Sequence, residues 1–345
     1  MQKKEGIGLC LIGCGRAGMI HARNFANRVP GARMAAVADV AIEAARAAAL
    51  ELDIDAFSLD YRDFLRSSEV DAVIVVSPTD LHCGIVKECA AYGKHVFCEK
   101  PMAMNQAECR EMIDACDAAG VKLQIGFMRR FDRSFARAKE LLDAGAIGDL
   151  VLIKSHTRGP SKPRPWMYDL KKSNGILAEV NSHDIDAVRW YSNSDFSSLY
   201  AVGGNYRNPE VREEYPDYYD NVVVTGSLKS GAQFVIDGAA YVQYGYDSHV
   251  ELVGTKGVLH VGGKRPDSIE FTVPGEGTRT NFVNSWTTLF EDAYLNEDIA
   301  FAKAITENLE PRVTGLDGLM AVAAVEAGNE SIRESRIVSL QMEEK

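Results

Sequence analysis

The sequence lacks the features that mark membrane, nucleic-acid-binding and metal proteins. It contains no apolar run long enough to span a bilayer. Its 38 lysines and arginines are outnumbered by 49 acidic residues, and the net charge of -11 at pH 7 repels phosphate backbones and anionic headgroups. It has no C-x-x-C pair and no histidine cluster with metal-ligand spacing. We therefore expect small-molecule partners, with no nucleic acid, no membrane and no metal.

Cysteine is confined to the first third of the chain, where no cysteine belongs to a ligand or redox motif. Such residues are typical of small buried side chains in a protein kept reduced. Residues 1–5 lead directly into an apolar segment, which leaves no room for a signal peptide. These features predict a cytoplasmic location. The cysteines are Cys10, Cys14, Cys83, Cys89, Cys98, Cys109 and Cys116.

The length of 345 residues exceeds what one hydrophobic core usually organises, so we expect two domains. The first, over residues 1–125, alternates short β-rich apolar runs with alanine-rich segments of helical period. This alternation predicts βαβ units and a doubly wound parallel sheet of the α/β class. Its expected strands are 7–12, 34–38, 72–76, 95–98 and 122–125. Its expected helices are 19–28, 42–51, 81–92 and 106–118.

The second domain is expected over residues 126–345, as an α+β unit with an open, mostly antiparallel sheet. Short turns separate several of its apolar runs, which indicates hairpins. The proline-rich stretch 159–165 is expected to be a loop. Strands are expected at 150–156, 221–228, 233–241, 248–253 and 257–261. Helices are expected at 134–144, 177–191, 287–306 and 316–331, the last two packing back on the first domain.

Four arginines lie near the start of the second domain. Such a run can form a basic patch, or it can lie along one solvated helix face or a subunit contact. We favour the solvated face or subunit contact. The residues are Arg129, Arg130, Arg133 and Arg137.

The segment Gly13–Gly18 reads G-x-G-x-x-G, directly after the first strand and at the start of a helix. In that context the backbone can approach a pyrophosphate at a helix N-terminus. The second strand ends at Asp39, about 20 residues further on, where an acid takes the ribose hydroxyls of NAD. The same carboxylate repels the 2′-phosphate of NADP. The segment therefore predicts NAD binding, although Arg16 could instead neutralise such a phosphate.

Two further segments follow parallel strands, where ligands bind. Ser77-Pro78-Thr79 follows strand 72–76, and Glu99-Lys100-Pro101 follows strand 95–98. A lone lysine is usually a surface charge, so the functional interpretation of Lys100 depends on this position. We expect Lys100 to face the nicotinamide, where a cationic ring and partial burial would lower its pKa.

Glu179 and His183 are spaced i and i+4 and so share one face of the expected helix. A carboxylate beside an imidazole orients it and raises its basicity, which suits proton transfer. The simpler alternative is a helix-capping or core histidine. We interpret Asp186, one turn further on, as structural.

Together these residues resemble the glucose-fructose oxidoreductase, inositol dehydrogenase and MocA (Gfo/Idh/MocA) family, most closely its inositol 2-dehydrogenase branch. The resemblance covers nearly the whole chain. It implies an NAD-binding Rossmann domain, a second domain that binds substrate, and a homo-oligomer, with a tetramer favoured, built through the second sheet. The matching segments are Gly13–Gly18, Asp39, Thr79–His82, Glu99–Pro101, Gln124–Asp132, Glu179–His183 and Tyr244–Asp247.

The resemblance assigns the family's catalytic lysine to Lys100 and its histidine to His183. The carboxylate partner falls on Glu179, where inositol dehydrogenases typically carry aspartate, so the substrate stays open. The cofactor set implied is Gly13, Gly15, Arg16, Ala17, Gly18, Asp39, Ser77, Pro78, Thr79, His82, Glu99 and Lys100. The loop 156–160 and Trp166 also depart from the family's pattern. The residues expected at the substrate are Lys100, His156, Arg158, Trp166, Asn181, His183 and Tyr246.

The expected reaction is oxidation of a secondary ring hydroxyl of a cyclitol or sugar to a ketone by NAD, with His183 or Lys100 accepting the hydroxyl proton. The longer acid Glu179, and Trp166, which could stack on a sugar ring, motivate an alternative glycoside 3-dehydrogenase that makes a 3-oxo-sugar. An alternative of another class is a non-catalytic NAD-binding regulator.

Overall fold

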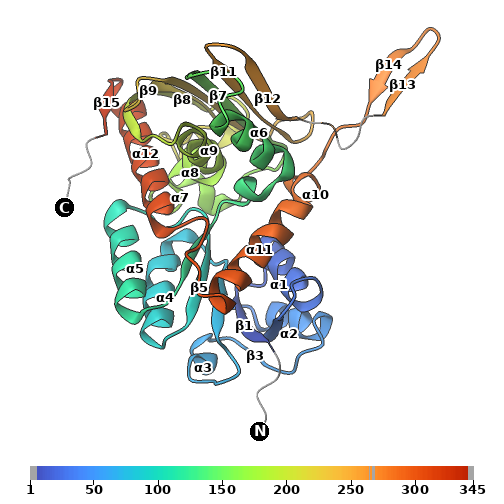
Figure 1. Ribbon diagram of the computed structural model, residues 1–345, viewed down its shortest axis with the longest axis vertical. Helices are drawn as coiled ribbons and strands as arrows, with labels where there is room; N and C mark the ends of the chain where they lie inside the picture. The colour runs from blue at the N-terminus through green and yellow to red at the C-terminus, as the bar shows by residue number, and fades with distance from the viewer. Residues whose placement is uncertain (1–5, 264, 266–268, 341–345) are drawn as a thin grey trace. The chain divides into compact units, whose positions relative to one another are not determined.

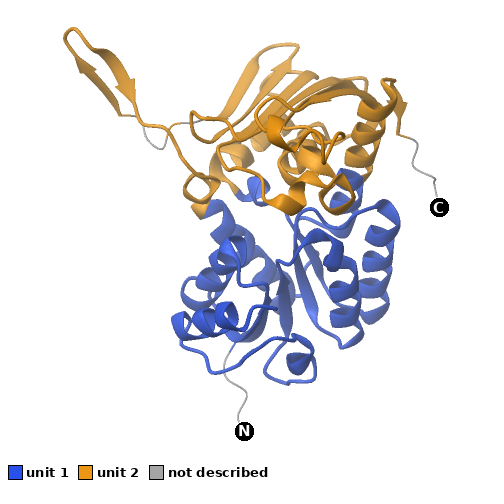
Figure 2. Cartoon of the chain, turned by 180° about the vertical axis from the view of Figure 1, so that it is seen from behind, with its two compact units in different colours: residues 1–131, 292–322 blue, residues 132–291, 323–345 orange. Residues whose placement is uncertain are grey.

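The computed structural model describes residues 6–263, 265 and 269–340, which form two compact units (Figure 2). Unit 1 comprises residues 1–131 and 292–322, and unit 2 comprises residues 132–291 and 323–345. The chain therefore returns to unit 1 after most of unit 2 has been built. Among the described residues, none of the helices combines the length and apolar character needed to cross a membrane.

Unit 1 is built on a six-stranded parallel sheet with the order β3-β2-β1-β4-β5-β6 (Figure 1). The order reverses between β1 and β4, and this switch point is where doubly wound sheets bind ligands, at the carboxyl ends of the strands. The predicted doubly wound parallel sheet is confirmed. The strands are β1 (Ile7–Ile12), β2 (Ala32–Ala38), β3 (Phe57–Ser58), β4 (Ala72–Val75), β5 (His95–Glu99) and β6 (Leu123–Gly126).

The helices of unit 1 pack alanines and aromatic side chains against this sheet. In the core, Phe97 of β5 stacks edge-on against Phe301 of the late helix α11, with ring centroids 5.7 Å apart. Helix α5 begins where Asn105 accepts a hydrogen bond from Glu108 N, and ends at Gly120 with φ +65°. The helices are α1 (Arg16–Asn27), α2 (Ile42–Glu51), α3 (Arg62–Leu65), α4 (Thr79–Ala91), α5 (Gln106–Ala119), η1 (Met128–Phe131) and α11 (Glu291–Thr306).

Two expectations for this part of the chain need correction. The elements β3 and α3 were not expected, because two and four residues are too short to show a periodic pattern. Arg129 and Arg130 do not lie on a solvated face: both are buried in η1, and Arg130 Nη2 lies 3.0 Å from Asp317 Oδ1. Burial of a guanidinium requires such a partner.

Unit 2 contains a seven-stranded sheet with the order β12-β11-β7-β10-β9-β8-β15. All neighbours are antiparallel except β7 and β10, so the predicted open, mostly antiparallel sheet is confirmed. Two further strands form a separate hairpin. The strands are β7 (Leu150–Gly159), β8 (Phe196–Gly204), β9 (Asn221–Leu228), β10 (Gln233–Ala240), β11 (Asp247–Gly254), β12 (Val258–Gly263), β13 (Glu270–Val273), β14 (Gly277–Thr280) and β15 (Val338–Ser339).

Helices cover one face of this sheet (Figure 1). The helix expected at 177–191 is broken at Val180 and Asn181 into α8 and α9. The helix expected at 287–306 is likewise divided at Phe290 into α10 and α11. The remaining helices are α6 (Arg133–Asp143), η2 (Pro165–Tyr168), α7 (Leu170–Ser173), α8 (Gly175–Glu179), α9 (Ser182–Ser192), η3 (Pro209–Val211), α10 (Trp286–Leu289) and α12 (Gly315–Glu334), which begins in unit 1 and ends in unit 2.

Candidate functional site

The glycine loop joins β1 to α1, and each of its glycines has a different physical role. Gly13 has φ +101°, and a Cβ there would lie 2.5 Å from Val76 O. A Cβ on Gly18 would lie 2.1 Å from Gly13 O, so only glycine lets the helix pack on the loop. At Gly15, the N-cap of α1, a Cβ would meet nothing within 4 Å, and no side chain caps the helix. The open space and uncapped N–H groups suit a phosphate.

Asp39 follows β2 and lies directly beside this loop. Its Oδ2 accepts a hydrogen bond from Cys14 N at 2.7 Å, and its Oδ1 accepts one from Ala41 N at 2.8 Å. The carboxylate is thus held against the glycine loop, next to the place where a phosphate would lie. Each carboxylate oxygen has a second lone pair that can accept from a ribose hydroxyl. The arrangement fits the adenosine half of a dinucleotide.

His82 ties together the loops that follow β4 and β5. It lies on α4, where its Nε2 is 2.9 Å from Ser77 O and its Nδ1 is 2.9 Å from Pro101 O. The imidazole is buried, and burial lowers the pKa of His82 although the two carbonyl groups oppose the shift. This placement gives His82 a positioning role between Ser77 and Lys100. Contact of His82 with a cofactor stays a prediction.

Behind Lys100, a buried chain of charged groups fixes the end of β5. Lys100 N donates to Glu99 Oε2 at 2.9 Å, and Glu99 Oε1 lies 3.2 Å from His21 Nε2. His21 Nδ1 lies 2.6 Å from Asp298 Oδ1. The other oxygen of this carboxylate, Asp298 Oδ2, accepts a hydrogen bond from Asn24 Nδ2 at 2.8 Å. Burial alone lowers the pKa of His21, but the two carboxylates outweigh it and hold that pKa well above its ordinary value. The imidazolium therefore locks Glu99 in place.

In unit 2, the start of α9 is clamped to the sheet. Asp184 accepts a hydrogen bond from Ser155 Oγ of β7 at 2.6 Å and one from Asn181 Nδ2 at 2.8 Å. A Cβ at Gly238 of β10 would lie 1.8 Å from Asn181 Oδ1, so glycine is required there. These contacts fix the first turn of α9, which carries His183. Asn181 is completely buried by them, and its expected contact with substrate stays a prediction.

The predicted pair of Glu179 and His183 lies in two helices. Glu179 is the last residue of α8, and His183 lies in the first turn of α9. Both belong to unit 2, whereas Lys100 belongs to unit 1. The convergence of the amine and the imidazole on one alcohol carbon therefore stays a prediction.

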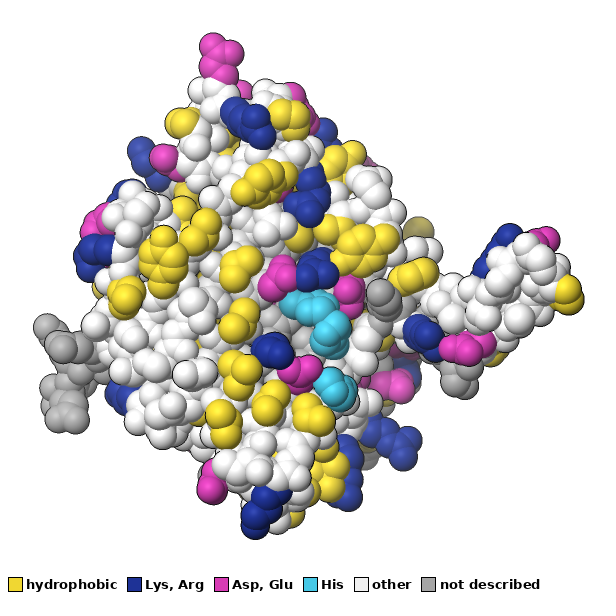
Figure 3. All heavy atoms as spheres, turned by 90° about the horizontal axis from the view of Figure 1, so that it is seen from above, with side chains coloured by type: hydrophobic (Ala, Val, Ile, Leu, Met, Phe, Trp, Pro, Cys, Tyr) yellow, Lys and Arg dark blue, Asp and Glu magenta, His cyan; other side chains and the backbone are white. Residues whose placement is uncertain are grey.

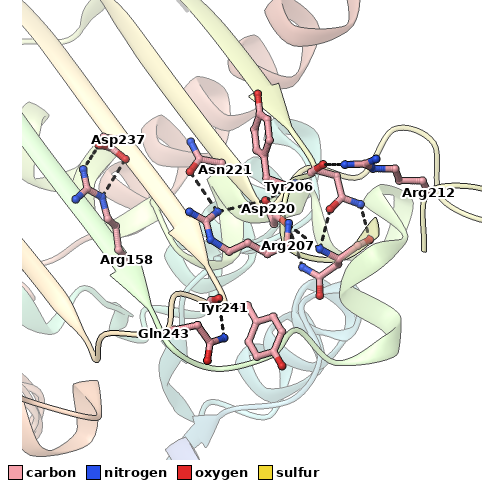
Figure 4. Close-up of polar contacts among 11 residues, drawn as sticks. Arg158, Tyr206, Arg207, Arg212, Asp220, Asn221, Asp237, Tyr241 and Gln243 are labelled. Carbon is pink, nitrogen blue, oxygen red and sulfur yellow. Dashed lines mark hydrogen bonds and ion pairs between the residues drawn. The ribbon is translucent and has the colours of Figure 1, made fainter. Parts of the chain in front are cut away.

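Two residues expected at the substrate lie on the other face of β7. Successive strand residues point to opposite faces. Ser155 points to α9, so His156 and Arg158 point away from it. There Arg158 pairs with Asp237 of β10 (Figure 4), and His156 Nε2 lies 3.2 Å from Asp247 Oδ1. The structure does not bring His156 and Arg158 to the face that carries α9 and His183.

Tyr246 and Trp166 were also expected at the substrate. Tyr246 precedes β11, is buried, and has its ring 6.4 Å from that of Phe290 in an edge contact. Trp166 lies in the short helix η2 and is partly exposed. Both stay candidates for substrate contact.

Three residues near the candidate site were missed from the sequence. His21 and Asp298 lie 277 residues apart, so no spacing could signal their contact. Thr157 is buried on the same face of β7 as Ser155, the face against α9. The period of two along the strand could have favoured Thr157 over His156, once Ser155 was known to point inward.

Comparisons with known proteins establish the family. Residues 7–127 match the model of an oxidoreductase family with an NAD-binding Rossmann fold, GFO/IDH/MocA, and residues 135–260 match the GFO/IDH/MocA C-terminal domain. The chain belongs to this family. The predicted family, the Rossmann domain and NAD as its cofactor are thereby confirmed, and the open cradle at Gly15 and the carboxylate of Asp39 fit that cofactor.

Relatives match almost end to end. The chain is 33% identical over 335 residues to the uncharacterised oxidoreductase YrbE of Bacillus subtilis, covering 97% of each. It is 33% identical over 331 residues to the myo-inositol 2-dehydrogenase of Thermotoga maritima, covering 96% of this chain and 98% of that one. The structure of scyllo-inositol dehydrogenase from Lactobacillus casei with bound NAD(H) and scyllo-inositol superposes with a TM-score of 0.89 at 27% identity. The match covers 97% of this chain and 99% of that one.

Proposed function

We propose that this chain oxidises a secondary hydroxyl of a cyclitol ring to a ketone, with NAD as the oxidant. The observation that carries the proposal is the NAD cradle at Gly15 and Asp39, with Lys100 held at the end of β5 of the same sheet. Full-length relatives that act on myo-inositol and scyllo-inositol support the cyclitol as substrate.

The chemistry divides between the cofactor and this chain's side chains. Bound NAD supplies the two-electron acceptor for the hydrogen on the carbinol carbon. Lys100 or His183 removes the proton of the hydroxyl, and Lys100 also stabilises the negative charge that develops on this oxygen. Glu179 orients His183. The buried His21–Glu99 contact keeps the Lys100 backbone in one position, which is what precise transfer requires.

A second candidate is oxidation of a glycoside to a 3-oxo-sugar. Glu179 motivates it, because one more methylene than aspartate changes where the acid meets a ring hydroxyl. Trp166 supports it, because a partly exposed indole on η2 can stack on a pyranose. The regulator alternative is disfavoured, since a protein that only sensed NAD would need neither Lys100 nor His183.

Initial rates with NAD separate these functions. We expect NADH to form with myo-inositol or scyllo-inositol at a kcat/KM at least about 10-fold above that with methyl glucoside, since one changed polar contact is worth that much. The absorbance of NADH gives the rate. The reverse preference would favour the glycoside 3-dehydrogenase. NAD binding without turnover across inositols, aldoses and glycosides would favour the regulator.

Cofactor choice tests the role of Asp39. Asp39→Ala is expected to lower kcat/KM for NAD about 10- to 100-fold, because hydrogen bonds to a charged acceptor contribute about 1.5–3 kcal/mol. The ratio of NADP to NAD activity should rise, since the repelling charge is gone. The matched control is Asp117→Ala on the exposed side of α5. An unchanged ratio in Asp39→Ala would contradict this assignment.

Three broader features belong to the same proposal. Residues 1–125 serve as the NAD-binding domain, and residues 126–345 as the domain for substrate and assembly, with the last helices packing on the first domain. The protein works as a homo-oligomer, with a tetramer favoured, built through the second sheet. It works in the cytoplasm, in keeping with seven free cysteines.

A further inference from the structure

Three possible metal ligands meet on the face of the unit 2 sheet that points away from α9. Strands β7 and β11 are antiparallel, and their register places His156 directly opposite His249. Asp247 lies two residues before His249 and so on the same face. Diagonal neighbours on one face are within reach of each other's side chains. The strand pairing therefore gathers two imidazoles and a carboxylate on that face.

The distances between these groups match those between ligands of one ion. Asp247 Oδ1 lies 3.2 Å from His156 Nε2 and 3.4 Å from His249 Nδ1. One possible ligand atom from each residue lies within 4.8 Å of the others. With metal–ligand bonds of about 2.1 Å, neighbouring ligand atoms are about 3.0 Å apart in an octahedron and about 3.4 Å apart in a tetrahedron.

Both imidazoles lie at ion-pair distance from the carboxylate, but hydrogen bonds of standard geometry do not account for the arrangement. The side chain of Asp247 is only 6% exposed, yet its Oδ1 and the buried Nε2 of His156 have no partner in hydrogen-bond geometry. A buried polar atom without a hydrogen-bond partner destabilises the folded state. The imidazole rings of His156 and His249 are also close, with centroids 3.6 Å apart, where aromatic pairs prefer about 4.5–7 Å. A shared cation would satisfy all three groups.

The surroundings leave room for further ligands. Asp247 and His249 help to line a cavity of about 480 Å³, together with Ser134 and Phe290. Opposite His249 on β12 is Gly262, which adds no side chain over the site. Water could therefore complete the coordination of an ion with three protein ligands, as in open zinc sites.

Neighbouring charges do not replace the cation. Lys154 and Arg158 flank His156 on the same face of β7, and they are already paired with Glu251 and Asp237. Tyr244 Oη lies 3.5 Å from both Arg158 Nη1 and Asp247 Oδ2, so it bridges the two groups. Figure 3 shows histidine side chains gathered with acidic and basic ones on this side of the molecule.

We propose that His156, Asp247 and His249 bind one divalent transition-metal ion, Zn²⁺ or a similar ion, which joins β7 to β11. Two imidazoles and a carboxylate suit zinc and its neighbours, whereas Mg²⁺ and Ca²⁺ prefer oxygen ligands. The sequence predicts no metal, and the proposed site replaces that prediction. His156 and His249 are far apart in the chain, and only the register of β7 and β11 brings them together.

Titration with Zn²⁺ alone tests the site. The full chain is stripped with a chelator and titrated by calorimetry without NAD or substrate, so the result is independent of the proposed reaction. We expect one Zn²⁺ per chain. His249→Asn and His156→Asn should each weaken binding at least about 100-fold, because losing even a residue behind a ligand costs 10- to 100-fold. Zn²⁺ should raise the Tm of the unsubstituted protein but not the Tm of either of these two variants.

The control is His260→Asn, on β12 of the same sheet. His260 is an exposed imidazole 3.6 Å from Glu251, so it reports weak surface binding. This variant should bind Zn²⁺ like the unsubstituted protein. If a variant at His156 or His249 does not fold, Co²⁺ in the unsubstituted protein decides: visible absorption bands that Zn²⁺ abolishes support the site. Absence of these bands, absence of stoichiometric Zn²⁺ binding, or equal binding by all three variants would overturn it.

Discussion

Replacing Lys100 by methionine is expected to lower kcat/KM for the ring alcohol about 10³-fold, while the affinity for NAD changes little. Methionine keeps most of the length of the lysine stem but removes the ammonium group. Acid–base catalysis by a positioned side chain contributes about 10² to 10⁴ in rate. Initial rates give kcat and KM, and fluorescence titration gives the affinity for NAD.

A large effect is expected because the backbone around Lys100 is fixed on both sides. The backbone N–H of Lys100 donates to Glu99, which in turn contacts His21. His82 contacts the carbonyl groups of both Pro101 and Ser77. The matched control is Lys87→Met on α4, an exposed lysine paired with Glu111. Its kcat/KM should stay within about twofold, as for most surface substitutions. Turnover of Lys100→Met at the unsubstituted rate, with NAD still bound, would refute the catalytic role.

Replacing His183 by asparagine is expected to lower kcat at least about 10²-fold, with a smaller change in KM. The imidazole accepts or relays a proton only as the reaction proceeds, so its loss affects the transition state more than substrate binding. Glu179→Gln should lower kcat by less, about 10-fold, because the imidazole is still present but less well oriented. Steady-state kinetics on the preferred inositol measure both effects.

A fold defect would mimic this result, so stability has to be followed in parallel. His183 shares the first turn of α9 with Asp184, which anchors the helix to Ser155. His183→Asn leaves that anchor in place and should melt close to the unsubstituted protein. His260→Asn, a histidine on the sheet and outside the site, serves as the activity control. If His183→Asn keeps normal kcat, the imidazole has no part in proton transfer.

The first domain could be predicted closely from the sequence because its signals are local. The glycines before α1, the acid after β2 and the near-continuous apolar strands each act within a few residues, and Ile42–Glu51 was located to the residue. Long-range contacts gave no such signal. The link from Glu99 to His21 spans 78 residues, so a histidine on α1 could not be assigned a partner.

The second unit was harder to predict because the face of a strand depends on what packs against it. His156 and Thr157 are neighbours in sequence, yet β7 sends them to opposite faces. The contact from Ser155 to Asp184 of α9 shows which face is covered. The break between α8 and α9 was also not evident, since Ile176 to Ile185 keeps a helical apolar spacing across Val180 and Asn181.

The return of residues 292–322 to unit 1 means that the nucleotide-binding half is discontinuous in the chain. A fragment that stops at Phe131 would lack α11, and with it Phe301 from the core and Asp298, the acid bonded to His21. Such a fragment would expose apolar surface and leave a buried imidazole without one of its two counter-charges. To excise this half as an independent module, residues 1–131 would have to be spliced to the segment 292–322.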